Sequence, residues 1–258
     1  MSETASDTDA DETPGFTITS ENLNDFLTPI SQLVDECRLR LGEDGLTVRA
    51  VDPANVAMID VSLDAAAFER YAGNGSVLGI NLDRLEDIIN APADKDLISI
   101  ELDPDTHKLH IEAGAMDYQM ALIDPDSVRQ EPDFPDLDLD YDIGISDDQL
   151  DEMITTADIV SDHLAFFAED GRFGAIASGD TDDAEIDYTA DEIERLDGSG
   201  KVESLYSLDY LNEVNSGIST EGTVTIELGD EFPILVNWTF ANTAGAGTYM
   251  VAPRIESD

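Results

Sequence analysis

Residues 124–141, DPDSVRQEPDFPDLDLDY, divide the chain into two parts of similar length. The stretch is rich in proline and in acidic residues, it has no glycine, and one large apolar side chain, Phe134, stands among its prolines. Proline holds a backbone extended at low entropic cost, and a polar acidic stretch does not build a core. The composition therefore predicts an extended strap that connects two domains.

The sequences on either side of the strap repeat one another at an offset of 126 residues, with one small insertion expected in the hairpin at 241–248. The matching positions are Val34 with Val160, Glu43-Asp44-Gly45 with Glu169-Asp170-Gly171, Leu82-Asp83 with Leu208-Asp209, Leu85 with Leu211, and Ile100-Glu101-Leu102 with Ile226-Glu227-Leu228; Asp35 and Asp162 match one residue out of step. A shared offset across four segments predicts two copies of one α+β domain, each with two helices over an antiparallel sheet. The expected boundaries are a disordered acidic tail at 1–14, domains at 15–123 and 142–258, and the connector at 124–141.

Hydrophobic periodicity predicts the elements of each copy. In the first copy we expect a helix over 20–41, capped by Ser20, with Cys37 on its apolar face and with a kink or a later start at Pro29. A short helix opened by Asn81 and five strands should follow. In the second copy we expect helices over 145–164 and 207–217. The strands expected in the two copies lie at 46–52, 56–64, 97–103, 108–114, 118–124, 166–178, 184–190, 223–229, 233–241 and 248–255.

The charge is extreme, with 59 acidic against 12 basic residues and a formal net charge of −47. The hydrophobic content of 41% nevertheless supports folded cores. The Debye length is roughly 10 Å at about 0.1 M salt and roughly 3 Å at about 1 M, so only molar salt screens such a surface well. We therefore expect a folded protein with an acidic coat in a high-salt cytoplasm, as in halophilic archaea, rather than an ordinary acidic protein.

Several classes of protein are not supported by the sequence. The single cysteine, Cys37, excludes an internal disulfide, and no apolar run is long enough for a membrane span or a signal peptide, so we expect a soluble, intracellular protein. His107, His110 and His163 lack metal-ligand spacing, and the acidic run at 180–183 lacks that of a calcium loop. With no catalytic motif either, we expect no enzyme, no metal and no cofactor.

Four segments in this order resemble the archaeal and eukaryotic sliding clamp family, proliferating cell nuclear antigen (PCNA). They are LTVRAVDP at 46–53, LID at 122–124, SLDYL at 207–211 and YMVAPRI at 249–255. The resemblance covers about 16–258, and the acidity and scarce lysine are similar to the haloarchaeal branch. It implies a head-to-tail homotrimer, six similar domains in a pseudo-sixfold ring around duplex DNA, with sheets outside and helices lining the hole.

The resemblance also implies a pocket beside the strap, into which partner proteins insert an apolar plug. The implied pocket residues are Val51, Asp52, Asn55, Val56, Phe134, Pro135, Pro233, Tyr249, Val251, Ala252 and Pro253. Asn55 stands where many relatives have histidine, so the polar contact there is open. The alternative for Phe134 is that it only packs the strap onto its own domain.

The implied subunit joint uses the edge strands at 118–123 and 184–189, with Tyr118, Met120, Leu122, Ile186 and Tyr188 at the interface. Either segment could instead be an ordinary edge strand protected by its acids. Arg84, the only base in the two short helices, is expected to face DNA, although Asp87 could pair with it. Arg38, Arg40 and His163 are expected near the ends of the long helices.

Two functions follow. The first is a sliding clamp, or DNA polymerase processivity factor, whose partners would be double-stranded DNA, DNA polymerase, clamp loader, flap nuclease and DNA ligase, in a nucleoid-associated, cytoplasmic setting without a membrane. The second is an acidic adaptor that mimics the charge of DNA and encircles nothing. The oligomeric mass in high salt distinguishes them.

Overall fold

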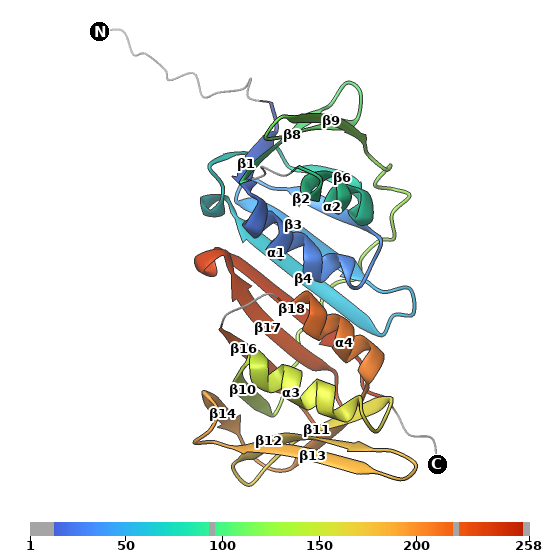
Figure 1. Ribbon diagram of the computed structural model, residues 1–258, viewed down its shortest axis with the longest axis vertical. Coiled ribbons are helices and arrows are strands. Elements are labelled where there is room, and N and C mark those ends of the chain that lie inside the picture. The colour runs from blue at the N-terminus through green and yellow to red at the C-terminus, as the bar shows by residue number, and fades with distance from the viewer. Residues whose placement is uncertain (1–12, 93–95, 219–221, 255–258) are drawn as a thin grey trace, which may run out of the picture.

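The computed structural model describes residues 13–92, 96–218 and 222–254. The chain is elongated, with the first half at the top of Figure 1 and the second half at the bottom, and the α-helices lie on the viewer's side of the sheets. Residues 1–12, most of the tail that was predicted to be disordered, lie outside the described residues. No helix in the described part of the chain is long and apolar enough to cross a membrane.

Both halves have the same order of elements, strand, helix, five strands, helix and three strands. The first half contains β1 (Gly15–Thr19), α1 (Ser20–Ser31), β2 (Glu36–Leu41), β3 (Gly45–Val51), β4 (Ala57–Asp64), β5 (Arg70–Ala72), β6 (Ser76–Asn81), α2 (Leu82–Asn90), β7 (Leu97–Asp103), β8 (Lys108–Ala113) and β9 (Met116–Ala121). The second contains β10 (Tyr141–Ser146), α3 (Asp147–Ala157), β11 (His163–Glu169), β12 (Arg172–Ser178), β13 (Asp183–Thr189), β14 (Arg195–Gly198), β15 (Val202–Ser207), α4 (Leu208–Gly217), β16 (Thr223–Leu228), β17 (Ile234–Phe240) and β18 (Gly245–Val251). The predicted α+β duplication is confirmed.

The strands form three antiparallel sheets, and one of them joins the halves. The nine-stranded sheet has the order β14-β10-β16-β17-β18-β4-β3-β2-β6, so β18 of the second half pairs with β4 of the first. The other two sheets have the orders β5-β1-β7-β8-β9 and β13-β12-β11-β15. The two halves are therefore fixed to each other by a continuous ladder of backbone hydrogen bonds.

The first helix is shorter than predicted. The side chain of Thr19, not Ser20, caps α1 by accepting from the N–H of Asn22 (3.3 Å), and the helix ends at Ser31, soon after Pro29. Cys37 lies on β2 instead, where ECRLRL alternates between exposed and buried positions. The prediction of one helix over 20–41 was wrong because a helical and an alternating pattern adjoin there without a glycine between them. The shorter α2 was predicted well, since Asn81 does cap it by accepting from the N–H of Arg84 (2.9 Å).

The pairing registers also correct the repeat. With Leu82 matched to Leu208, elements β6, α2 and β7 keep the offset of 126. Strands β2 and β3 match β11 and β12 at an offset of 127 residues. Leu39 lies opposite Leu78, and Phe166 lies opposite Ser204, the residue that corresponds to Leu78. Strand β4 matches β13 at 125. A constant offset of 126 was therefore wrong in detail. The registers agree with the insertion predicted before the last strand, because Val236 matches Ile111 at an offset of 125 and Tyr249 matches Tyr118 at 131.

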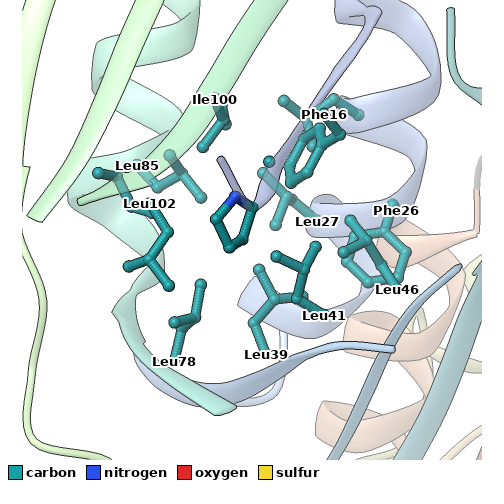
Figure 2. Close-up of a pocket in the computed structure, with 14 residues that line it drawn as sticks. Phe16, Phe26, Leu27, Leu39, Leu41, Leu46, Leu78, Leu85, Ile100 and Leu102 are labelled. Atoms are coloured by element: carbon teal, nitrogen blue, oxygen red, sulfur yellow. The ribbon is translucent and has the colours of Figure 1, made fainter. Parts of the chain in front are cut away.

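The core lies between the helices and the sheets. Figure 2 shows leucine and phenylalanine side chains of the first half that converge from helix and strands on one point. The void between them is only about 10 Å³ and is lined by apolar atoms, so it is interior packing and has no room for a ligand. Cys37 is part of this core, and burial raises the pKa of its thiol to about 12, which leaves it unreactive.

Candidate functional site

The strap is tied to the first half by Arg129. Its guanidinium donates to the backbone carbonyl of Asp52 (2.7 Å) and to the side-chain oxygen of Asn55 (2.5 Å). Asn55 has a left-handed backbone with φ of 60°, which asparagine tolerates better than most residues. Within the chain the side chain of Asn55 therefore holds the strap to the β3–β4 loop.

A second tie uses Glu131, whose side chain is only 10% exposed. Arg40 pairs with one carboxylate oxygen of Glu131, and Arg38 lies 3.9 Å from the other. Both arginines come from β2, so the prediction that they stand near the ends of helices was wrong. In Figure 1 the strap runs down one side and then behind the sheet, away from the helices. The ion pairs of Glu131 fasten the strap to β2.

On the same side of the sheet, four apolar residues lie directly opposite one another on neighbouring strands. They are Val51 on β3, Met58 on β4, Met250 on β18 and Leu235 on β17. None of the four belongs to the core cluster on the helix side. Val128 of the strap is also buried. The row therefore forms an apolar floor on the strap side, in which Val51, Met58 and Leu235 are already buried within the chain and Met250 is half-buried.

Two of the residues predicted for the pocket do not face it. Tyr249 and Val251 are fully buried in the helix-side core, and the hydroxyl of Tyr249 donates to the carbonyl of Pro29 in α1 (2.5 Å). Side chains alternate along a strand, so Met250 between them faces the strap side instead. Met250, Met58 and Leu235 were not predicted as pocket residues, although the alternation within 249–251 was available as a signal for Met250.

Asp52 shapes the loop rather than presenting a charge. Its carboxylate accepts from the N–H groups of Ala54 (2.7 Å), Val56 (2.7 Å) and Ala57 (2.8 Å) and from the hydroxyl of Tyr210 in α4 (2.9 Å). Burial acts to raise the pKa of Asp52, but these donors outweigh it and lower the pKa below its usual value. The ionised carboxylate therefore fixes the loop that forms one wall of the candidate pocket.

The remaining predicted pocket residues lie at the surface. Phe134 and Pro233 are half-buried, and Pro135 is exposed. Ala252 and Pro253 are half-buried just past β18, and the N–H of Ala252 donates to the carbonyl of Val56 (2.8 Å). An incoming strand therefore cannot use that N–H, because it is already engaged within the chain.

The predicted edge strands are edges in the structure, since β9 ends the five-stranded sheet and β13 ends the four-stranded sheet. Tyr118 on β9, Ile186 and Tyr188 on β13, and Leu122 just past β9 are half-buried. Met120 is fully buried in its own core, so only its backbone is free to contact another chain. Both edges thus offer unpaired backbone groups flanked by partly exposed apolar side chains.

The helical face carries almost no positive charge. Helices α1 to α4 contain two, three, four and two acidic residues against one base, Arg84. The guanidinium of Arg84 donates to the hydroxyl of Tyr118 on β9 (3.3 Å), which brings it to the sheet edge. His163, predicted near a helix end, lies on β11. A duplicated α+β chain with all helices on one face, a strap on the other and open edges at both ends has the architecture of the sliding-clamp class.

Comparisons with known proteins agree with this class. Residues 19–127 match the family model for the N-terminal domain of proliferating cell nuclear antigen. The DNA polymerase sliding clamps of Natronomonas pharaonis and Haloarcula marismortui are each 48% identical over 243 residues, which is 93% of this chain and 98% of theirs. The A. fulgidus PCNA solved with the C-terminal region of FEN-1 has a TM-score of 0.88 at 33% identity, covering 95% of this chain and 99% of that one. The chain therefore belongs to the proliferating cell nuclear antigen family of DNA polymerase sliding clamps, and haloarchaea are among its relatives.

Proposed function

We propose that three copies of this chain close into a ring that encircles double-stranded DNA and that tethers replication and repair proteins beside the strap. The observation that carries the proposal is that the two open edges are repeats of the two strands that already join the halves. Strand β9 corresponds to β18, and β13 corresponds to β4. Pairing β9 with β13 of the next chain would repeat the internal joint between subunits and leave neither strand unpaired.

The repeat also gives the register of this joint. Within the chain Tyr249 lies opposite Ile59. Ile100 and Ile226 are matched positions of the two repeats. Ile100 lies opposite Ile111, which lies opposite Tyr118, and Ile226 lies opposite Val236, which lies opposite Tyr249, so Tyr118 corresponds to Tyr249. In the same way Ala184 corresponds to Ile59. We therefore infer that Tyr118 lies opposite Ala184 of the partner subunit.

Arg84 belongs to this joint by the same reasoning. It corresponds to Tyr210, two residues after the matched Leu82 and Leu208. Tyr210 reaches across the internal joint to Asp52, so Arg84 would reach toward the acidic loop between β12 and β13 of the partner subunit. This places the base at the joint, beside the hole, rather than along the middle of it.

In such a ring the helices would line the hole, and their acids would repel phosphates. A closed ring remains on DNA through topology, and in molar salt direct phosphate contacts would add little affinity. The chain would act as a non-catalytic scaffold, with domains at 15–123 and 142–258 joined by the connector at 124–141. DNA polymerase, clamp loader, flap nuclease and DNA ligase are the proposed partners.

We place the binding of these partners at the floor of Val51, Met58, Met250 and Leu235, with Phe134 and Pro135 as the strap side of the pocket. A short peptide with an apolar plug fits this arrangement, since buried apolar anchors carry most of the energy in such interfaces. The ionised carboxylate of Asp52 is already satisfied within its own loop, so the peptide meets a rigid wall there.

The test combines mass and peptide binding. In about 3 M KCl, a salt in which the Debye length is below 3 Å, we expect a trimer of about 84 kDa, three times 28.0 kDa. Phe134→Ala should weaken a fluorescent client peptide at least tenfold without changing the mass. Ile159→Ala, a control at an exposed apolar residue just past the end of α3, should bind like the unaltered chain. A monomer at every salt concentration would favour the acidic adaptor and overturn the ring.

A further inference from the structure

We propose that His110, Glu112 and Asp117 bind a divalent transition ion such as Zn²⁺ and that Glu185 of the partner subunit completes the site across the joint. The first part concerns one chain only, and the second part rests on the ring proposed above. Neither part was foreseen from the spacing of the histidines, because the site depends on the pairing of β8 with β9.

The three side chains share one face of the β8–β9 hairpin. His110 and Glu112 are two residues apart on β8, so both point outward, and Asp117 lies directly opposite Glu112 on β9. Nε2 of His110 lies 2.8 Å from Oδ1 of Asp117 and 3.9 Å from Oε1 of Glu112. The three ligand atoms all lie within 4.8 Å of one another.

These separations suit a metal ion. Ligand atoms about 2.0 Å from a tetrahedral zinc ion lie roughly 3.3 Å apart, which falls between the two distances that involve Nε2. One imidazole and two carboxylates are a donor set that first-row transition ions accept, whereas Mg²⁺ and Ca²⁺ prefer oxygen alone. The imidazole thus separates this cluster from the many purely acidic groups of the surface.

The nearby charges leave the cluster room for a cation. Glu101 on β7 lies opposite His110 and pairs with Arg70 (3.0 Å). Lys108, on the same face of β8, lies beside Asp103, whose carboxyl pKa is lowered chiefly by hydrogen bonds from Thr106 and to a smaller extent by the charge of Lys108. The side chains of Glu112 and Asp117 are 61% and 69% exposed. Two exposed carboxylates beside the imidazole of His110 favour binding of a divalent ion.

The joint supplies the fourth ligand. In the internal joint Asp60 lies opposite Thr248. By the correspondences derived above, these positions become Glu185 of the partner subunit and Asp117. Two carboxylates directly opposite each other on paired strands repel, and an ion held between them would convert this repulsion into a bridge. The site would therefore stabilise the subunit joint as well as the hairpin.

The test of the site uses zinc alone and the full chain. Metal-free protein in about 3 M KCl, with excess Mg²⁺ to occupy the acidic coat, is titrated with ZnCl₂ against a chromophoric chelator. We expect one zinc per chain, with affinity lowered at least tenfold in His110→Gln and in Asp117→Asn. The matched control is His107→Asn, which removes an imidazole from a left-handed turn position outside the cluster. Equal zinc binding by the unaltered chain and by His110→Gln would overturn the site.

The test of the bridge is a mutant cycle. Glu185→Gln should lower zinc affinity at least fivefold in the assembled protein and have no effect in a Tyr118→Ala background, where the joint is open. Zinc should also lower the KCl concentration at which the assembly dissociates, and it should not do so in His110→Gln. If Glu185→Gln leaves zinc affinity unchanged in an assembly of confirmed trimer mass, the bridge is wrong. A monomer that still binds one zinc would refute the ring and the bridge, but not the single-chain site.

Discussion

Strands β18 and β9 occupy the same place in the two repeats, yet their surroundings differ. Strand β18 pairs on both sides, with β17 and with β4, and its Tyr249 is fully buried. Strand β9 pairs only with β8, and the matching Tyr118 remains half-buried. The difference shows how a duplicated chain closes one joint within itself and leaves a copy of that joint open at its two ends.

The two joints also differ in their polar contacts. At the internal joint the hydroxyl of Tyr210 donates to Asp52, whose charge is held by three backbone N–H groups. At the open joint the residue that corresponds to Tyr210 is Arg84. The strand proposed to lie opposite, β13 of the partner subunit, carries Asp183, Glu185 and Asp187 on its exposed side. In the proposed ring the open joint would therefore depend on charges that salt and ions can screen, whereas the internal one does not.

The largest effect is expected at the closed joint. Tyr249→Ala removes a ring that stacks on Trp238 and fills the core, so the free energy of unfolding should fall by about 3–5 kcal/mol. Chemical denaturation in high salt measures this loss. Tyr249→Phe, which keeps the ring, should lose far less. An Ala variant as stable as the unaltered chain would mean that the two halves are not held together at this position.

Tyr118→Ala should weaken association between subunits strongly and lower the stability of the single chain only slightly. Because its ring is half-buried in the single chain, the free energy of unfolding should fall by only about 1 kcal/mol. Association should weaken about a hundredfold per joint, about 2.7 kcal/mol, so that the mass falls to that of one chain. Light scattering after chromatography measures the mass, and Tyr118→Phe is the control that should still assemble. An intact trimer in Tyr118→Ala would break the proposed equivalence of the two joints.

Lowering the salt should open one joint before the other. Each chain carries −47, and at about 0.1 M salt a Debye length of roughly 10 Å leaves this repulsion between subunits largely unscreened. We expect the mass to fall to one chain while circular dichroism remains that of folded protein, because β4 and β18 are held in the same chain at high effective concentration. Equal ring stability at about 0.1 and 3 M salt would contradict this.

The smallest effect is expected for Arg84→Gln. Removing one partly exposed ion pair should weaken association up to about fivefold, within the 0–1 kcal/mol typical of such pairs. Arg195→Gln is the matched control, since Arg195 pairs with Asp142 of β10 and lies on β14, a strand outside the proposed joint. Sedimentation at several protein concentrations measures both variants. Identical association constants for the two would place Arg84 away from the joint.

Much of the fold could be predicted from the sequence, because alternation and caps are local signals. The strands at 46–52 and 56–64 and the cap at Asn81 were found in this way. Strands β1, β5, β6, β10, β14 and β15 were missed, since short strands that pair only with distant segments carry weak local patterns. The end of α1 was missed because neither glycine nor a full turn signal separates it from β2.

The site was harder to predict from the sequence than the fold. The strap and its neighbours were located through the resemblance, but which side chains face the strap depends on how they alternate along each strand. For that reason Tyr249 was predicted to face the strap, although its neighbour Met250 does so. The roles of Arg38, Arg40 and Arg129 in fastening the strap depend on contacts over long sequence distances. Such contacts leave no trace in a single sequence.

The most direct test of the proposed joint is a pair of engineered cysteines. The register places Gln119 opposite Asp183 of the partner subunit, and paired antiparallel residues lie within disulfide distance. The native Cys37 is buried and should not interfere. Under mild oxidation in high salt, Gln119→Cys with Asp183→Cys should give a covalent trimer on a non-reducing gel. Gln119→Cys with Asp187→Cys, four residues out of register, should not. Equal cross-linking by both pairs, or none by the first in an assembled trimer, would contradict the joint.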